Sequence, residues 1–323
     1  MAEIYLDRVF PCAAALEYQN WPPNTDVLFD LVGNGNFTFT HSGAEAIASV
    51  HWTVFLEVAR KTGKCHFITS AGEDAAMLQS LKRLEELGCF VKIAPLNEEG
   101  QIDVAKLKEL ISPRTALISI SMAHALTGVI QPIEEIAALG VPVHVDASYA
   151  LGKVVNPFQH VDYLTFAGTP IHSIPGSGGI FSKGLVIPIV PAKEPDPSAL
   201  HALCKAALHL QLSMDTMNLE VARLRDRLES PFKSLFQNSL RLPNIALLDF
   251  PGIHQEMLHY ALQRKNLFAT FGGHQHPHLR NISPSALSFT LSRYTTQDEI
   301  DRAIVILQET VASLKPLAED LIV

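Results

Sequence analysis

The chain has 323 residues, of which 47% are hydrophobic and 18% charged. This composition is typical of a compact globular protein, and the length predicts two packed domains or one large α/β unit. The formal net charge is −8 with scattered basic residues, which excludes the basic footprint of a nucleic-acid-binding protein.

Four cysteines occur without any C-x-x-C pair, at Cys12, Cys65, Cys89 and Cys204. This usage is typical of a reduced intracellular protein rather than of a disulfide framework. The first residues include an early acid and lack a long apolar core, so they do not resemble a signal peptide. No apolar run reaches membrane-spanning length. We therefore expect a soluble cytoplasmic protein that has neither a membrane nor nucleic acid as partner.

Strand and helix patterns alternate from residue 37 onward. Short apolar strands are expected at residues 37–40, 65–69, 90–94, 115–121, 141–145, 161–166 and 179–181. Amphipathic helical patterns lie between them, over residues 43–58, 73–87, 103–111 and 133–139. The alternation predicts an α/β fold whose mainly parallel central sheet is covered by helices on both faces.

Sheets of this kind bind ligands beyond the carboxyl ends of their strands. The candidate functional residues are therefore those that directly follow a predicted strand. They are Ser42, Gly43, Ser70, residues 122–124, Asp146 and residues 168–172.

The proline-rich stretch from Pro188 to Pro197 predicts a crossing between domains. A long helical pattern follows it, and the remainder combines a strand near residues 245–249 with a final helix over 297–314. We assign residues 16–195 to a large α/β domain and 196–228 to a connecting helix. Residues 229–323, together with 1–15, are expected to form a smaller α+β domain.

Two short motifs suggest ligand contacts. Ser42-Gly43-Ala44 sits between a strand and a helix, where small residues let backbone N–H groups approach an anion. The same turn is also compatible with an ordinary tight strand-to-helix connection. His144-Val-Asp146 ends a buried strand, and its carboxylate could hold a protonated heterocycle nitrogen or cap the helix that follows.

Taken in order, these motifs resemble those of fold-type-I pyridoxal-phosphate (PLP) enzymes, particularly the cysteine desulfurases within the class V aminotransferases. The chain shows counterparts of I-Y-L-D, F-T-S-G-A-T-E-A, G-V-V-Q and H-V-D-A, and further matches continue into the C-terminal part. These counterparts are residues 4–7, 39–46, 128–131, 144–147, 161–166, 224–228, 243–245 and 293–301. The resemblance spans nearly the whole chain.

The resemblance implies an aspartate-aminotransferase-like PLP-transferase fold, PLP as the cofactor, and a homodimer whose cleft uses residues of both subunits. It places the following residues at positions where the family contacts its cofactor: Ser42, Gly43, Ala44, Asp74, Asp146, Tyr149 and Thr169.

The resemblance fails where the chemistry of the family resides. The family needs a lysine that forms a Schiff base with PLP, in the motif S-G-H-K. Here the matching stretch is Ala167-Gly-Thr169-Pro170, which places a proline at the lysine position, and no lysine lies between Lys153 and Lys183. Asp74 replaces the ring-stacking histidine, and Ser288 replaces the arginine that clamps the substrate carboxylate.

Other departures concern the rest of the family's mechanism. His124-Ala replaces a pair of asparagines, Tyr149 replaces a glutamine, and residues 271–278 replace the desulfurase cysteine loop without a cysteine. The segment through which a partner subunit reaches the phosphate is replaced around residues 191–198. We therefore expect a non-catalytic relative to which PLP, if bound, is not covalently attached. Its partners would be an active paralogue or the iron–sulfur and sulfur-transfer proteins. Alternatively, the cleft that holds PLP in the family would bind a different ligand.

Two alternatives remain open at this point. The first is an enzyme that uses PLP or pyridoxamine phosphate (PMP) with His172 or His124 as the base instead of lysine. The second is a metal site in the histidine-rich segment at His274, His276 and His278. Lys153 and Lys183 are also weighed as substitutes for the missing lysine, and both are expected to have structural roles.

Overall fold

The computed structural model describes residues 4–5, 24–155, 157–190, 196–272 and 282–319. Contacts divide the chain into two compact units, which we call the large and small units. The large unit comprises residues 10–124 and 130–214, and the small unit comprises residues 1–9, 125–129 and 215–323. Among the described residues, no helix combines the length and apolar character that a membrane crossing would require.

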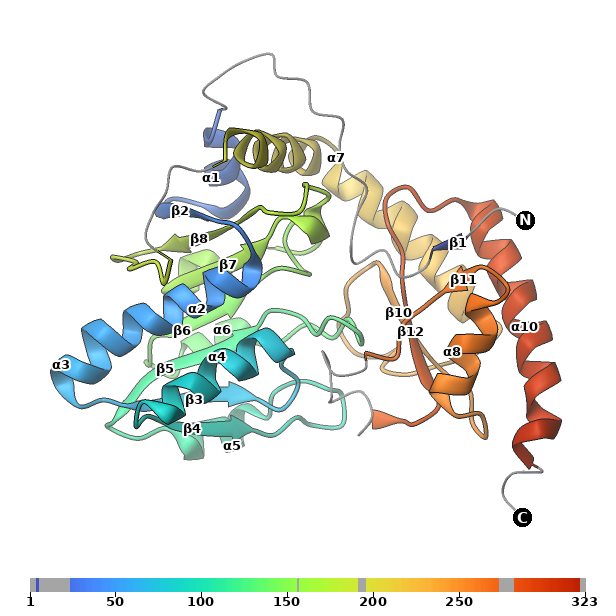
Figure 1. The fold of residues 1–323 in the computed structure, drawn as a ribbon, viewed down its shortest axis with the longest axis horizontal. Coiled ribbons are helices and arrows are strands. Elements are labelled where there is room, and N and C mark those ends of the chain that lie inside the picture. The colour runs from blue at the N-terminus through green and yellow to red at the C-terminus, as the bar shows by residue number, and fades with distance from the viewer. Residues whose placement is uncertain (1–3, 6–23, 156, 191–195, 273–281, 320–323) are drawn as a thin grey trace. The chain divides into compact units, whose positions relative to one another are not determined.

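A seven-stranded sheet forms the centre of the large unit, with the order β2-β8-β7-β6-β5-β3-β4. The five strands from β7 to β4 pair in parallel, whereas β8 pairs antiparallel with β7 and with the edge strand β2. The expected α/β fold with a mainly parallel sheet is therefore confirmed (Figure 1). The strands are β2 (Asn36–Thr40), β3 (His66–Ser70), β4 (Phe90–Ala94), β5 (Thr115–Ser121), β6 (Val143–Asp146), β7 (Tyr163–Ala167) and β8 (Gly178–Ser182).

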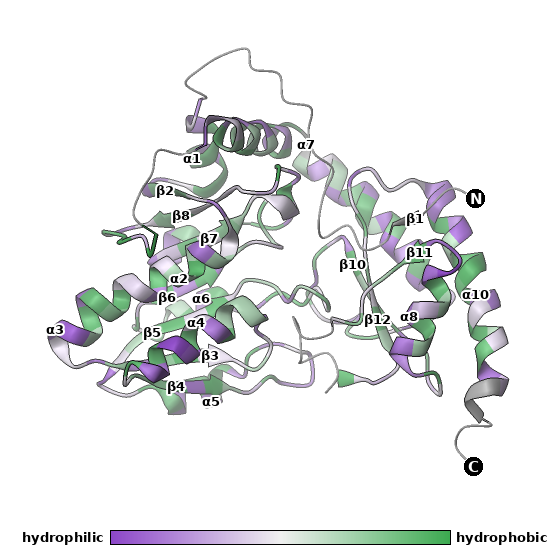
Figure 2. Ribbon diagram, viewed as in Figure 1, coloured by the Kyte–Doolittle hydropathy of each residue, from purple (hydrophilic) through white to green (hydrophobic). Residues whose placement is uncertain are grey.

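The central strands are apolar because both faces of the sheet are covered. Strands β3, β6 and β8 are buried at every position. Figure 2 shows hydrophobic colouring over much of the sheet, although β6 also buries His144 and Asp146. The helices of this unit are α1 (Asp26–Val32), α2 (Gly43–Val54), α3 (Arg60–Thr62), α4 (Ala75–Glu86), α5 (Val104–Leu110) and α6 (Ile133–Ala137).

Helices α2 and α4 pack on one face of this sheet through a shared apolar core. This core joins Val50 of α2 and Leu81 of α4 to Phe67 and Leu117 of the strands. The helix expected over residues 43–58 is longer than predicted, because α2 continues through a π-helical turn (Phe55–Ala59) into α3. Burial of these residues on folding is the main stabilising contribution to the large unit.

The small unit has its own core, between its helices and two small sheets. Its three-stranded antiparallel sheet has the order β12-β10-β9, and β1 pairs in parallel with β11. Helix α7 passes from the large unit into the small unit. The elements are β1 (Ile4–Tyr5), α7 (Pro197–Glu229), β9 (Lys233–Ser234), β10 (Ile245–Asp249), α8 (Gln255–Gln263), β11 (Leu267–Phe268), β12 (Ala286–Thr290) and α10 (Gln297–Glu319).

The segment 125–129 groups with the small unit, although its neighbours in the chain belong to the large one. Two hydrogen bonds explain this grouping. The Ser288 hydroxyl donates to the Leu126 carbonyl over 2.8 Å, and the Leu242 N–H donates to the Gly128 carbonyl over 2.8 Å. A segment that the sequence assigns to the large domain is thus held by residues of the C-terminal part, Ser288 on β12 and Leu242 before β10.

Candidate functional site

Asp146 lies at the carboxyl end of β6 and is buried. Its Oδ1 atom accepts hydrogen bonds from the hydroxyls of Thr165, over 2.8 Å, and Ser148, over 3.0 Å. Thr165 stands directly opposite Asp146 on β7, so the parallel register creates this contact. Both recorded partners are side-chain hydroxyls, so this carboxylate does not act as the helix cap that the sequence left open.

The surroundings of Asp146 disfavour its charged form. Burial raises the pKa of Asp146 to about 7, and the nearby carboxylates of Asp74 and Glu73 raise it further. The hydrogen bonds from Thr165 and Ser148 lower it, but by less. In the described part of the chain, no donor is recorded for its Oδ2 atom, which leaves that oxygen able to accept one more hydrogen bond. A cationic N–H group at this position would relieve the charge cost.

A second buried carboxyl group, Glu73, follows β3, and the sequence reasoning assigned it no role. The Ser70 hydroxyl donates to Oε1 over 2.5 Å, and the N–H and hydroxyl of Ser121 donate to Oε2 over 3.0 and 2.6 Å. Burial nevertheless raises the pKa of Glu73 to about 7. The signal that could have revealed it is a serine at the end of each of two neighbouring strands, β3 and β5.

Asp74, at the position of the family's ring-stacking histidine, is the N-cap of α4. Its Oδ1 atom accepts a hydrogen bond from the Met77 N–H over 3.0 Å. The side chain thus has a structural partner in its own helix. It still lies near enough to Asp146 to raise the pKa of that group.

The turn at Ser42 precedes α2. Side chains of the turn accept hydrogen bonds from some of its own backbone N–H groups. The Ser42 hydroxyl accepts from the Glu45 N–H over 3.1 Å, while the Glu45 carboxylate accepts from the His41 N–H over 2.9 Å. Gly43 packs so tightly that a Cβ atom there would lie 3.0 Å from the Cβ of Ala167. Letter by letter, Ala44 stands where the family motif has threonine, so the hydroxyl of that position is missing.

Pro170 sits in a short 3₁₀ turn, Thr169–Ile171, directly after β7. A serine staple closes the loop around it. The backbone carbonyl of Ser177 accepts from the Gly168 N–H over 2.8 Å, and the Ser177 hydroxyl donates to the Ile174 carbonyl over 2.7 Å. A Cβ atom on Gly168 would lie only 2.1 Å from the Ser177 hydroxyl oxygen, so the loop requires glycine there for close approach.

Neither lysine considered as a substitute is a free amine. The Lys153 amine donates to the backbone carbonyls of Tyr149 and Pro170, over 2.9 and 3.3 Å. Lys183 donates to the Gln159 carbonyl over 2.9 Å and is exposed. All three contacts are with backbone oxygens.

The two candidate histidines lie on different loops of the large unit. His172 ends the 3₁₀ turn in the left-handed region, at φ 67°, which is a strained conformation for a residue with a side chain. His124 follows β5 and is buried. A Cβ atom on Gly72 would lie 3.3 Å from the His124 ring, which places that ring beside the loop after β3.

The remaining candidates divide between described and undescribed residues. Tyr149 and Thr169 are half-buried. The Tyr149 carbonyl accepts a hydrogen bond from the Lys153 amine, and the Thr169 carbonyl accepts one from the His172 N–H. His274, His276 and His278 lie outside the described residues. Within the described ranges, no group of three or more His, Cys, Asp or Glu side chains could hold a metal ion.

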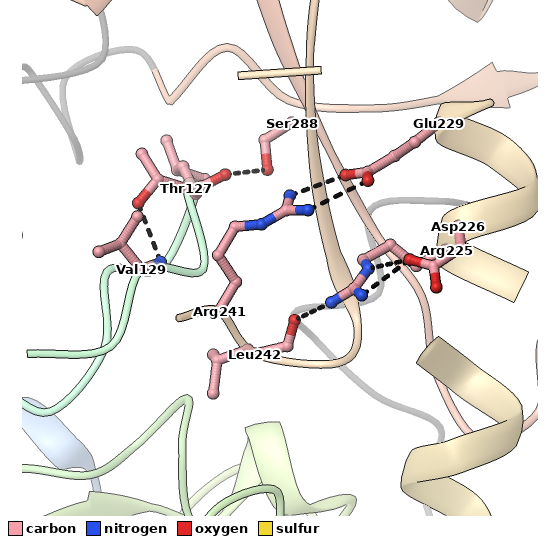
Figure 3. A network of polar contacts seen from close by, with 9 residues as sticks. Thr127, Val129, Arg225, Asp226, Glu229, Arg241, Leu242 and Ser288 are labelled. Atoms are coloured by element: carbon pink, nitrogen blue, oxygen red, sulfur yellow. Dashed lines mark hydrogen bonds and ion pairs between the residues drawn. The ribbon is translucent and has the colours of Figure 1, made fainter. Parts of the chain in front are cut away.

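Ser288 belongs to the small unit and is buried on β12. Its hydroxyl donates to the Leu126 carbonyl, and Figure 3 marks this hydrogen bond by the dashed line that ends on Ser288. Beside it in Figure 3, Arg241 forms a two-pronged ion pair with Glu229, with contacts of 2.8 and 3.1 Å. This guanidinium is neutralised by its partner, and Ser288 cannot supply the charge of the family's arginine.

The residues present fit PLP at one end only. Asp146 is a buried carboxylate with a spare oxygen, which suits the protonated ring nitrogen that PLP would bring. The aldehyde end has Pro170 in place of an amine, and the phosphate turn has Ala44 in place of a hydroxyl. We therefore derive no chemical step through this cofactor.

Comparison with known proteins places these observations in a family. The model of the family "Aminotransferase class-V" matches residues 29–184. The chain is 30% identical over 298 residues to cysteine desulfurase 2 of Trichormus variabilis, covering 81% of this chain and 75% of the relative. It is 27% identical over 329 residues to the cysteine desulfurase NifS of Azotobacter vinelandii, covering 90% and 79%.

The fold comparison agrees with the sequence comparison. A solved NifS-like protein superimposes with a TM-score of 0.85 at 22% identity, covering 97% of this chain and 99% of the other. The resemblance drawn from the motifs is thus confirmed for family and fold.

Proposed function

Because the chain belongs to the cysteine desulfurase family of class V aminotransferases, we propose that it is a non-catalytic member with a regulatory or partner-binding role. The observation that carries this proposal is Pro170 at the Schiff-base position, in a loop that glycine and serine contacts hold closed. A proline side chain has no amine with which to form an imine and no group that can move a proton.

Three further features support the same reading. The Lys153 amine is held by two backbone carbonyls, Asp74 caps a helix where the family has a stacking ring, and Ser288 holds a backbone carbonyl where the family has arginine. Each position retains a structural role without the reactive group. Such a pattern is expected of a scaffold maintained for its surface rather than for catalysis.

The proposed partners follow from the family. We propose a homodimer, and beyond it either an active paralogue or a protein of iron–sulfur or sulfur transfer. The three cysteines in the described part of the chain, Cys65, Cys89 and Cys204, are free thiols. This supports the cytoplasm as its compartment.

The test is covalent trapping. Purified protein is incubated with PLP and reduced with borohydride, and its intact mass is measured. We expect no stoichiometric adduct on the wild-type chain, because no amine is available at the Schiff-base position. The matched variant Pro170→Lys restores the amine beside the retained Asp146, and we expect it to acquire an adduct at residue 170.

A wild-type adduct that maps to one lysine would overturn the proposal. The variants Lys153→Arg and Lys183→Arg then identify which amine reacted, since arginine keeps the charge and hydrogen-bonding capacity but does not form a stable imine. A small, non-stoichiometric labelling of several surface lysines is the expected background.

A second candidate function is a PMP-dependent enzyme with His172 as base. The observation in its favour is the left-handed conformation of His172, because strained residues cluster at functional sites. Calorimetric titration with PMP tests it. Saturable binding that weakens in His172→Gln, while Asp74→Asn has no effect on it, would favour this enzyme over the non-catalytic reading.

A further inference from the structure

A pocket lies between α2 and α4, in the large unit, and no family motif assigns it a ligand. It has a volume of about 270 Å³. Apolar side chains line most of it, including Trp52, Leu84 and Ile189. The Trp52 ring stacks on Phe55 with an interplanar angle of 27°, so one wall is an aromatic surface. A ligand with one flat ring suits a pocket of this size and lining.

Arg83 supplies the positive charge of the pocket. It is exposed and lines the pocket from α4. Among the described residues, no ion pair or hydrogen bond of Arg83 is recorded, in contrast to the paired Arg225, Arg227 and Arg241. A guanidinium without an acidic partner favours a ligand that carries a carboxylate.

His51, Gln79 and Ser80 also line the pocket with polar side chains. Of these, Ser80 is the outer end of a hydrogen-bond chain that reaches Asp146. The sense of this chain can be derived from its inner end. Thr165 donates its only hydroxyl hydrogen to Asp146, so it must accept from Nε2 of His144, 2.9 Å away. The His144 hydrogen is therefore on Nε2, and its Nδ1 accepts from Ser119 over 2.7 Å. The Met77 sulfur, 3.0 Å from the Ser119 hydroxyl, is the weaker of its two acceptors.

The outer part of the hydrogen-bond chain runs through Ser119 and His51. Ser119 has donated its hydrogen, so it accepts from Nε2 of His51 over 2.7 Å. The bare Nδ1 of His51 then accepts from the Ser80 hydroxyl over 2.7 Å. Burial lowers the pKa of His51 to about 3 and that of His144 well below its usual value, so both rings are neutral as this derivation needs.

The consequence is a constraint on the ligand. The only hydroxyl hydrogen of Ser80 is donated to His51. Toward the pocket, the Ser80 oxygen can therefore only accept a hydrogen bond. A ligand group that meets Ser80 must therefore be a donor, such as a phenol O–H or a ring N–H.

We propose that this pocket binds a small aromatic carboxylate that carries a hydroxyl group on its ring. The carboxylate pairs with Arg83, the ring packs against Trp52 and Leu84, and the hydroxyl donates to Ser80. Chains of hydrogen bonds polarise one another, so such a ligand also strengthens the chain that ends on Asp146. The inference goes beyond the non-catalytic role and does not depend on PLP binding.

The test uses 4-hydroxyphenylacetate as the probe and the fluorescence of Trp52 as the signal. The chain has two tryptophans, so the full-length Trp21→Phe variant leaves Trp52 as the sole reporter. We expect a saturable fluorescence change. The substitution Arg83→Met should weaken binding at least about tenfold through loss of the charged contact. The matched substitution Lys82→Met, the next residue on the same helix, should leave it unchanged.

The donor requirement is tested separately. Phenylacetate, which lacks the hydroxyl, should bind about fivefold or more weakly to the protein with Ser80, and this difference should vanish in Ser80→Ala. No saturation up to about 10 mM probe, a dissociation constant roughly tenfold weaker than 1 mM, would overturn the inference. Equal affinity for the two probes, or no effect of Arg83→Met, would do so too. Loss of binding as protein concentration rises, with a second copy covering the pocket, would also overturn it.

Discussion

Asp146 combines deep burial with two hydroxyl partners, and its pKa is raised to about 7. A raised folded-state pKa means that the stability linked to this group is present below its unfolded value, near pH 4, and is lost as pH rises through about 7. An asparagine side chain at this position would not titrate and could keep the two hydroxyl contacts. The free energy of unfolding of Asp146→Asn should therefore rise relative to wild type between pH 4 and 7, by up to about 1.4 kcal/mol per pH unit.

Denaturant unfolding at several pH values measures this difference. The matched control is Asp249→Asn, in the small unit. Burial opposes ionisation of Asp249, but hydrogen bonds from Lys233, Ser285 and Ser283 outweigh it and lower its pKa. A depressed pKa contributes stability above the unfolded value, so this variant should lose stability relative to wild type as pH rises from acid values. The same pH trend in both variants would contradict the assignment of Asp146.

Asp74 provides a second test at the scale of one residue. As the N-cap of α4 it accepts from the Met77 N–H, so Asp74→Ala should lower the free energy of unfolding by about 1 kcal/mol. Asp74→Asn keeps the cap and should change stability by less than about 0.5 kcal/mol. Thermal unfolding of the two variants separates them. An equal loss in both would show that the charge of Asp74, and not its cap, stabilises the helix.

At the scale of elements, the chain from Ser80 to Asp146 joins two helices to three strands. The register of β5, β6 and β7 places Ser119 opposite His144 and Asp146 opposite Thr165. The derived sense of the chain requires both His51 and His144 to carry their hydrogen on Nε2. Nitrogen NMR of the labelled protein at pH 6 should show both rings neutral in this form. A hydrogen on Nδ1 of either ring would reverse the sense and remove the donor requirement at Ser80.

Much of the element pattern could be predicted from the sequence, because buried strands and amphipathic helices have distinct periods. The strand ending in Asp146 and the helix after Ser42 lie where their motifs predict them. The antiparallel direction of β8 could not be predicted, because the sequence of a short apolar strand does not indicate in which direction its neighbour runs. The break of α2 into a π-helical turn at Phe55 left no Gly or Pro signal.

The candidate site was predictable only in part. Residues that follow a strand, such as Asp146 and Pro170, can be placed from chain order because parallel strands end at one edge of the sheet. Glu73 was missed although a serine ends each of two predicted strands, because the meeting of Ser70 and Ser121 at its carboxylate depends on the order of those strands in the sheet. The role of Asp74 as a helix cap was not predicted, because the helical pattern over residues 73–87 includes it, whereas α4 begins at Ala75.

At the scale of the whole molecule, the chain has two units with separate cores, and a buried ion pair belongs to one of them. Arg241 and Glu229 are both buried in the small unit. Arg241→Met leaves the Glu229 charge without its partner and should cost about 3–5 kcal/mol, while adding Glu229→Leu should recover most of that loss. Hydrogen exchange resolved by peptide should rise in β10 and β12 for the single variant. The parallel strands β5 to β7 should keep their protection, because their core contains neither residue. An equal rise in both units would show that they unfold as one, and a double variant no better than the single one would assign the loss to packing rather than to the unpaired charge.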